Sequence, residues 1–440
     1  MGVDDEPPAS RASREDRNAK PGLPSSQALA DATPGEHAPE NEPKPSIRNP
    51  KEDEILDACH RRDIAALQSL SISTGGFVTD ALRQQAWPVL LGMPIIPDFS
   101  KEDPNVADDS WKLLAPHKDE GQVQLDVERA FVYYPDYSSE KERAFYKERL
   151  SDLILSVLRR YPYIHYFQGY HDIAQVFLLV LPPRLRCAAV SRLSLLRIRD
   201  FMLPNLKAAI SQLRLIPSIL HAADPKLWAH LSQTEPFFAL SGTLTMYAHD
   251  VQSQNEITRL FDVLLAREPV FSVYMFAQIV LNRRAELFET EPDEPEMLHS
   301  ILSKLPQPLN LEALIKSTTQ LFDRHPPEKL GSAWRVGISE HSVLKTARST
   351  QTCAGQSEAV GGYFFSQQVL ELQRAERMER VLNTLWKYRR PARTVGIAVL
   401  IGILAYWVRR SVVPSGVLGH GQSLGQHVSY ALSKWWYRAF

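Results

Sequence analysis

The chain has 440 residues, too many for a small binding module, which predicts two compact domains or one large helical domain with appended segments. Its 50 basic and 51 acidic side chains leave a formal net charge of −1, so it lacks the overall positive field of proteins that bind nucleic acid, and no nucleic acid is expected as a partner. The three cysteines lie far apart without metal-ligand or disulfide spacing, so we expect a reduced, cytosol-facing protein that holds no metal.

Residues 1–50 form the first segment and are predicted to be a disordered arm. They contain nine prolines and no Phe, Tyr or Trp. A segment with so little apolar surface cannot offset the entropy lost when its backbone is ordered. We therefore expect the folded part of the chain to begin near residue 51.

Residues 51–325 are predicted to form an all-α domain, because their apolar side chains recur at helical spacing. The clearest example ends at Pro162 and consists of Leu150, Leu153, Ile154, Val157, Leu158 and Tyr161. An earlier helix is expected to be capped by Thr79 or Asp80 and to run through Leu91, where Gly92 closes it. The run 173–181 is apolar nearly all round, which indicates a fully buried helix.

The C-terminal part of the chain is divided by composition into four further segments. Residues 326–365 lose apolar periodicity and are predicted to be a linker. Residues 366–390 read as a polar helix, and residues 391–410 as a membrane anchor. Residues 411–440 form a basic and aromatic tail, since no acidic residue follows Glu379.

The predicted anchor contains Val395–Val408, a run of fourteen residues without charge. As a helix it would be ~21 Å long, short against a hydrocarbon core of ~30 Å. Arg393 and Arg409 can extend toward the two interfaces, and Tyr406 and Trp407 are residue types favoured there. The alternative is a buried helix that docks back on the main domain.

Asp126 and Arg129 are three residues apart in a predicted helix and therefore share a face. Taken alone, they are most simply an exposed ion pair that contributes ~0.3–0.5 kcal/mol. Arg83 and Trp87 lie four residues apart on an earlier helix. We expect these two side chains to stack, or to be buried together in a helix interface.

A tyrosine-rich turn leads from residue 161 to the start of the apolar helix and places Gln168 and Gly169 there. A helix N-terminus offers free N–H groups and positive potential, so an amide side chain at this point can be presented to a phosphate or to an attacking water. The simpler alternative is that Gln168 caps the turn and satisfies buried backbone groups. The residues of the turn leave both possibilities open.

In this order the three motifs resemble the signatures of the TBC-domain family, the Rab GTPase-activating proteins. Those signatures are Arg-x-x-x-Trp, Ile-x-x-Asp-x-x-Arg and Tyr-x-Gln, and they are matched here by residues 83–87, 123–129 and 166–168. Val123 stands in place of the usual Ile. The resemblance covers about residues 55–325. It implies a two-lobed helical domain that activates a Rab GTPase in its GTP form and is not itself the enzyme.

The resemblance also implies a role for each site residue. Arg129 would be an arginine finger inserted into the GTPase, and Gln168 would position the attacking water. Asp126 would hold Arg129 in an extended rotamer by a charge-assisted hydrogen bond, with Tyr166 and Gly169 as supporting residues. GTP and Mg²⁺ would arrive with the Rab, so no cofactor is expected of this chain. Arg83 and Trp87 would be a fold signature.

The stretches Tyr166–Ile173 and Arg199–Met202 resemble one branch of this family, which is anchored to the endoplasmic reticulum by a C-terminal hydrophobic segment. The run 395–408 stands where that branch carries its anchor. This resemblance implies a Rab of the early secretory pathway, a role in vesicle transport, and a helical domain that faces the cytosol from the endoplasmic reticulum membrane.

Three other functions are compatible with parts of the sequence. A TBC-like domain that binds a Rab without stimulating hydrolysis would share the fold but lack Arg129 or Gln168. A membrane-organising protein would shape or tether the membrane with its basic tail, and its helical domain would have no catalytic role. A metal-dependent phosphohydrolase of the His-Asp type would use His171 and Asp172 together with further ligands. The phosphohydrolase is disfavoured, because an acidic residue in the first turn of a helix is expected from the helix dipole alone.

Overall fold

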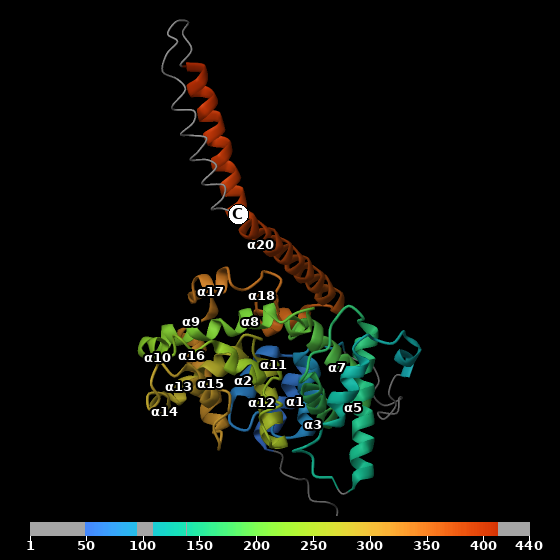
Figure 1. The fold of residues 1–440 in the computed structure, drawn as a ribbon. Helices are drawn as coiled ribbons and strands as arrows, with labels where there is room; N and C mark the ends of the chain where they lie inside the picture. The colour runs from blue at the N-terminus through green and yellow to red at the C-terminus, as the bar shows by residue number, and fades with distance from the viewer. Residues whose placement is uncertain (1–48, 95–108, 138, 412–440) are drawn as a thin grey trace, which may run out of the picture. The chain divides into compact units, whose positions relative to one another are not determined.

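The computed structural model describes residues 49–94, 109–137 and 139–411, and the regular structure in these ranges is entirely helical (Figure 1). The first helices are α1 (Pro50–Arg61), α2 (Ile64–Ile72), α3 (Asp80–Leu90), η1 (Asp109–Leu113), α4 (Glu120–Glu128), α5 (Glu140–Arg160), α6 (Tyr170–Val180) and α7 (Pro183–Leu196). The middle ones are η2 (Arg199–Met202), α8 (Lys207–Leu213), α9 (Leu215–Ala223), α10 (Pro225–His230), η3 (Pro236–Ala239), α11 (Leu240–Leu244) and α12 (Gln254–Ala266). The last are α13 (Phe271–Asn282), α14 (Arg284–Leu287), α15 (Pro295–Leu302), α16 (Leu311–Arg324), η4 (Pro327–Lys329), α17 (Ser332–Arg335), α18 (Val343–Thr346), α19 (Thr350–Gly355) and α20 (Glu358–Ser411).

The all-α prediction is confirmed for the described residues, and so are the helix boundaries that rested on capping residues. The Thr79 side chain accepts a hydrogen bond from the Leu82 N–H at the start of α3, and Gly92 follows that helix with φ of 68°. Helix α5 ends at Arg160, before Pro162. The predicted arm, apart from its last two residues, and the tail beyond residue 411 lie outside the described residues.

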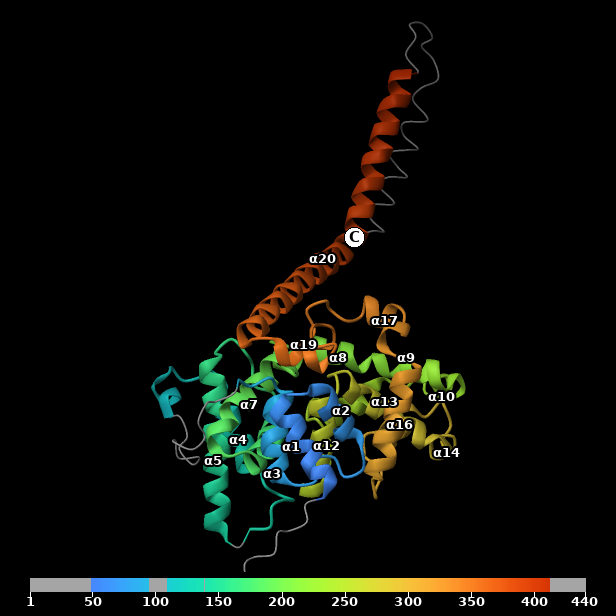
Figure 2. The same ribbon diagram turned by 180° about the vertical axis from the view of Figure 1, so that it is seen from behind.

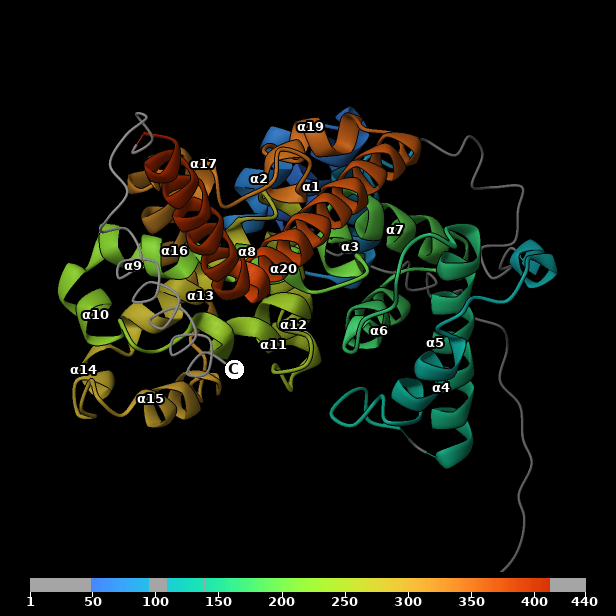
Figure 3. The same cartoon turned by 45° about the horizontal axis from the view of Figure 1, so that its top comes forward.

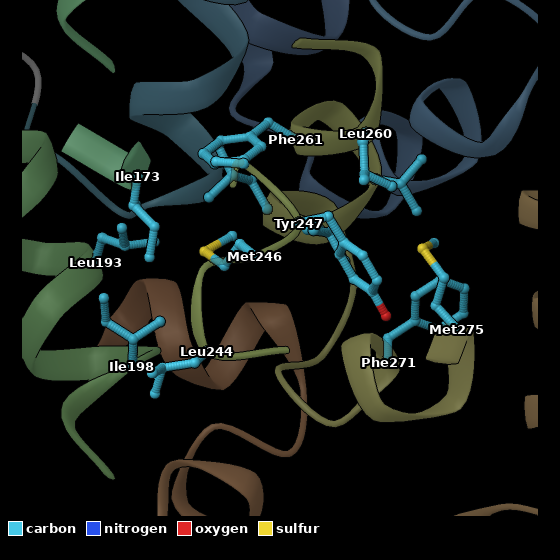
Figure 4. Close-up of a cluster of buried hydrophobic side chains, with 14 of the residues drawn as sticks. Ile173, Leu193, Ile198, Leu244, Met246, Tyr247, Leu260, Phe261, Phe271 and Met275 are labelled. Atoms are coloured by element: carbon cyan, nitrogen blue, oxygen red, sulfur yellow. The ribbon is translucent and has the colours of Figure 1, made fainter. Parts of the chain in front are cut away.

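Helix α12 is the central element of the domain. Its residues 257–266 are all buried, and it packs against α2, α3 and α6 as well as α16. Figure 3 shows α4, α5 and α6 on one side and α10, α14 and α15 on the other. Phe261 of α12 meets Ile173 of α6 and Leu193 of α7 around Met246 (Figure 4). One continuous apolar core therefore joins the two sides.

Buried Asp262 of α12 explains the Arg83–Trp87 pair of α3. Its carboxylate accepts hydrogen bonds from Trp87 Nε1 at 2.9 Å and from Arg83 Nε at 3.0 Å. The Phe77 N–H donates to the same carboxylate at 3.0 Å. The expected burial of Arg83 and Trp87 in a helix interface is thus confirmed. They converge on a shared acidic partner that ties α3 to α12.

We expect Asp262→Ala to lower the free energy of unfolding by about 3–5 kcal/mol, because it removes the buried carboxylate that pairs with the buried Arg83 guanidinium. Urea denaturation of the purified chain measures this loss. Asp80→Ala is the matched control, since Asp80 also contacts Arg83, at 2.7 Å, but is 42% exposed. The control should cost no more than ~1 kcal/mol. Equal losses in the two variants would contradict the central place given to Asp262.

Residues 326–365 are not the linker that their composition predicts. The buried carboxylate of Asp200 accepts a hydrogen bond from the Ser342 hydroxyl, from the Val343 N–H at 3.0 Å, and from Gln368 Nε2 at 2.8 Å. Side chains of this segment that are buried include Trp334, Leu344, Cys353 and Phe365. Asp200 is thus a buried acceptor that joins Ser342, Val343 and Gln368 to the domain. The polar helix expected at 366–390 is the interior of the longer α20.

The C-terminal half of α20 is exposed where the structure describes its side chains (Figure 1 and Figure 2). Large apolar side chains between residues 395 and 408 are 44–68% exposed, so they do not dock on the domain in this structure. Among the described residues, no single helix is long and apolar enough to cross a membrane. The segments Glu358–Arg389 and Arg393–Arg409 meet that criterion only as a pair, bent by 54°. Pro391 lies at the bend and lacks the N–H that an unbroken helix needs there.

Candidate functional site

Arg129 directly follows α4 as its C-cap residue, and its guanidinium group is directed toward solvent. Its side chain is 64% exposed. Nη2 donates to Asp126 Oδ1 at 2.7 Å, and Nε donates to the Leu125 carbonyl oxygen at 3.3 Å. Because two of its nitrogens are held by α4, the guanidinium has a fixed direction while its other N–H groups remain available for a partner.

Asp126, by contrast, is buried, with a side chain only 1% exposed. Besides Arg129, its carboxylate accepts hydrogen bonds from Gln122 Nε2 at 3.0 Å and from the Tyr166 hydroxyl at 2.9 Å. Burial, together with the nearby carboxylate of Asp126, raises the pKa of Tyr166, so its phenol stays protonated and acts as a donor. The carboxylate that orients Arg129 is therefore held from three sides.

The turn that carries Gln168 is attached to the segment that carries Arg129. The Tyr166 N–H donates to Asp119 Oδ2 at 3.0 Å, just before α4 begins. The ring of His117 makes a further hydrogen bond through Nε2 to the Ile164 carbonyl oxygen at 3.1 Å. With the Tyr166–Asp126 bond, these contacts fix the position of one motif relative to the other.

Gly169 brings the chain into α6 in a conformation that few other residues adopt. Its φ is 99°, and a Cβ atom built on it would lie 2.6 Å from Thr245 Cγ2. Gln168, directly before it, is exposed. The N-cap residue of α6 is Gly169 itself, which has no side chain that could cap the helix.

Arg129 and Gln168 line the same surface hollow, which has a volume of about 140 Å³. Its other lining residues are Asp126, Ala130, Phe131, Val132, Tyr133, Tyr134, His171, Asp172, Gln175, Ala248 and His249. A larger groove of about 540 Å³ adjoins it and shares four lining residues with it, Gln168, His171, Asp172 and His249. The structure thus places both predicted catalytic side chains at one concave, partly aromatic surface.

Two histidines at this surface have pKa values that are shifted in opposite directions. Burial lowers the pKa of His171, whereas a hydrogen bond of 3.0 Å to Asp172 raises the pKa of the more exposed His249. His171 Nε2 lies 3.3 Å from Asp172 Oδ1.

In the part of the chain that the structure describes, no three His, Cys, Asp or Glu residues are arranged to hold a metal ion.

Gln175 is a site residue that the motifs do not reveal. Its Oε1 accepts a hydrogen bond from the Phe131 N–H at 3.1 Å, and its Nε2 donates to the Tyr134 carbonyl oxygen at 3.2 Å. It thereby fixes the loop that follows Arg129, where Phe131 has φ of 62°. The signal in the sequence is that Gln175 is the one polar residue in the apolar run 173–181.

We expect Gly169→Ala to lower the free energy of unfolding by about 1–3 kcal/mol, because alanine is strained at positive φ and its methyl group would overlap Thr245. Thermal denaturation measures the effect. Gly121→Ala is the control, since nothing lies within 4 Å of a Cβ at this position in α4. There the exchange should be neutral or stabilising, by up to ~1 kcal/mol. An equally stable Gly169→Ala variant would show that the turn can relax.

The fold and this surface define a class of protein. Residues 80–288 match the family model of the Rab-GTPase-TBC domain, and the chain belongs to this family. The match begins in α3 and extends through α14, so it includes Asp126, Arg129 and Gln168.

Several known proteins are similar to this chain. TBC1 domain family member 20 of Bos taurus is 35% identical over 307 residues, which cover 69% of this chain and 73% of that protein. The GTPase-activating protein gyp10 of Schizosaccharomyces pombe is 33% identical over 326 residues, 73% of this chain and 84% of that protein. The GTPase-activating protein GYP8 of Saccharomyces cerevisiae is 26% identical over 359 residues, 71% of this chain and 69% of that protein. These relatives support a GTPase-activating function for a Rab partner.

Proposed function

We propose that this chain accelerates GTP hydrolysis by a Rab of the early secretory pathway, into whose active site it inserts Arg129 and Gln168. The observation that carries the proposal is their common exposure at one hollow, with Arg129 directed by the buried Asp126. Arg129 Nη2 and Asp126 Oδ1 are 2.7 Å apart. The pair is thus set up before any partner binds, so little entropy is lost in fixing the finger.

The chemistry of a GTPase explains why these two side chains suffice. Its γ-phosphoryl oxygens gain charge in the transition state, and its attacking water must be oriented in line with the leaving group. A planar guanidinium neutralises the first and spans two oxygens, while a primary amide can both donate to and accept from a water. In this proposal Arg129 does the former and Gln168 the latter. The nucleotide and Mg²⁺ belong to the Rab.

A panel of purified Rabs loaded with GTP, assayed for single-turnover hydrolysis with and without the chain, tests this proposal. Stimulation of one or a few Rabs is the expected result. Tight binding of a GTP-loaded Rab without faster hydrolysis would instead support a binding protein of TBC fold. The same panel identifies the substrate Rab, which no local motif of the chain encodes.

We further propose that residues 391–410 anchor the chain in the endoplasmic reticulum membrane, with the helical domain in the cytosol, where a Rab can reach it. The exposed apolar side chains at 395–408 support this role, because burying them in lipid is favourable. A short span suits this bilayer, whose core is ~27 Å thick, a few ångströms less than the average.

Carbonate extraction of membranes from cells that express the full chain tests the anchor. We expect the protein to stay in the membrane pellet, because a bilayer-embedded helix is not displaced by high pH. A variant lacking residues 395–408 should appear in the supernatant and serves as the control. Release of the full chain into the supernatant would show that the run is not embedded.

A further inference from the structure

The middle of α20 is amphipathic rather than polar. Met378, Val381, Leu382 and Leu385 follow one another at steps of three and four residues, so they form one face of the helix. Each of them is 49–62% exposed. Trp386 and Tyr388 flank this face and are 67% and 57% exposed. Together these six large apolar side chains form an exposed patch, and an exposed apolar patch is typical of a surface that binds a protein partner or a membrane.

The domain contacts α20 through a different set of residues. Glu376 accepts a hydrogen bond from Asn205 Nδ2 at 3.1 Å, and Glu379 lies 3.2 Å from Lys207 Nζ at the start of α8. Both contacts involve carboxylates, and neither uses the apolar face that begins at Met378. The helix can therefore remain attached to the domain while its apolar face binds elsewhere.

The charges around this face indicate what it binds. Between residues 374 and 393 the sequence has seven basic residues and two acidic ones, and the two acidic residues are those that contact the domain. Such a surplus repels a second copy of the same helix and attracts an anionic surface. Aromatic side chains at the flanks of an apolar face are favoured in the interfacial region of a bilayer. Arg389 lies over the Trp386 ring, at 4.9 Å, and so places a positive charge beside this aromatic residue.

We propose that residues 378–388 of α20 lie flat on a membrane that contains anionic lipids, with the Met378–Leu385 face in the headgroup and acyl boundary. This inference rests on the proposed anchor, since the run 395–408 follows within a few residues and would bring the helix to the bilayer. The bend near Pro391 separates a segment that lies on the membrane from one that enters it. The contacts of Glu376 and Glu379 then connect the membrane-bound helix to the domain, and so constrain how the hollow faces the Rab.

A cysteine scan of the full chain in vesicles tests this arrangement. Cys59 and Cys353 are buried, so Cys187→Ser removes the one native cysteine that is partly exposed. Leu382→Cys and Leu385→Cys place a label on the apolar face, and Asn383→Cys and Thr384→Cys are the matched controls on the polar face. Each variant is labelled with the environment-sensitive fluorophore NBD and reconstituted in vesicles of phosphatidylcholine with phosphatidylserine, or of phosphatidylcholine alone.

The expected result is a periodic pattern. In anionic vesicles, labels at 382 and 385 should emit at shorter wavelength and be quenched by nitroxide-bearing lipids, whereas labels at 383 and 384 should be quenched by aqueous iodide. The shift should be smaller in vesicles of phosphatidylcholine alone. Equal iodide quenching at all four positions would overturn the proposal. Protection of 382 and 385 from iodide without quenching by nitroxide lipids would also overturn it, in favour of a second copy of the chain.

Two measurements on the same samples separate this proposal from those on which it builds. Carbonate extraction of the vesicles reports the anchor at 395–408, and single-turnover hydrolysis by a responsive Rab reports the activator function. A retained anchor and intact stimulation without the periodic pattern would refute only the surface-lying helix. Release of the chain by carbonate would instead show that the anchor itself has failed.

Discussion

Arg129→Ala should remove most of the stimulation of GTP hydrolysis, a loss of ~10³ to 10⁵ in rate. This corresponds to about 4 to 7 kcal/mol of transition-state stabilisation. Because the side chain is 64% exposed and lies at the end of α4, the loss should not be accompanied by unfolding. Arg129→Lys should be nearly as inactive, since a point charge cannot replace a planar fork that contacts two phosphate oxygens. Single-turnover hydrolysis by a responsive Rab measures both variants.

Arg61→Ala is the matched control for this experiment. Arg61 is similarly exposed, at 60%, and also pairs with an aspartate on its own helix, with Nη2 2.8 Å from Asp57 Oδ2. It lies in α1, away from the residues that line the hollow. Its removal should leave hydrolysis unchanged. Full activity of Arg129→Ala, with circular dichroism unchanged, would refute the assignment of Arg129 as the finger.

The sequence predicts the helices well because they depend on local patterns, and it locates the candidate site residues through short motifs. Apolar spacing identifies α5, a threonine cap and a glycine bound α3, and the 173–181 run identifies α6. Arg129 and Gln168 belong to short motifs, so they can be located without knowing how the helices pack. Asp126 and Arg129 are three residues apart, so the helical spacing alone is enough to bring the two side chains together.

The contacts that the sequence does not reveal are those between residues far apart in the chain. Asp262 is separated from Arg83 by 179 residues, and only the packing of α12 on α3 brings them together. Asp200 orders residues 342 and 343 in the same way, which is why a segment of polar composition is folded and not a linker. Each of these acidic residues lies within a mostly buried stretch. An acidic residue in such a stretch indicates that a buried donor is present, but not which residue supplies it.

Gln168→Ala should also reduce the stimulated rate severely, because the proposed function has Gln168 and Arg129 act on the same transition state. Gln124→Ala, which removes an exposed glutamine of α4 that bonds only to Glu128 in the structure, should leave the rate unchanged. The double variant of Arg129 and Gln168 should lose far less than the sum of the two single losses, as residues that act as a unit do. Full additivity would indicate that the two side chains assist separate steps.

A Rab whose own glutamine has been replaced gives the decisive test of Gln168. If this chain supplies the amide that orients the water, the wild-type domain should still stimulate the altered Rab appreciably, and Gln168→Ala should abolish that stimulation. The expectation rests on the exposure of Gln168 at the hollow that Arg129 also lines, and on the turn at Gly169 that presents it. If the altered Rab does not respond to the wild-type domain although it still binds, the water is oriented by the Rab's own side chain. Gln168 would then contribute to binding at the hollow rather than to the reaction.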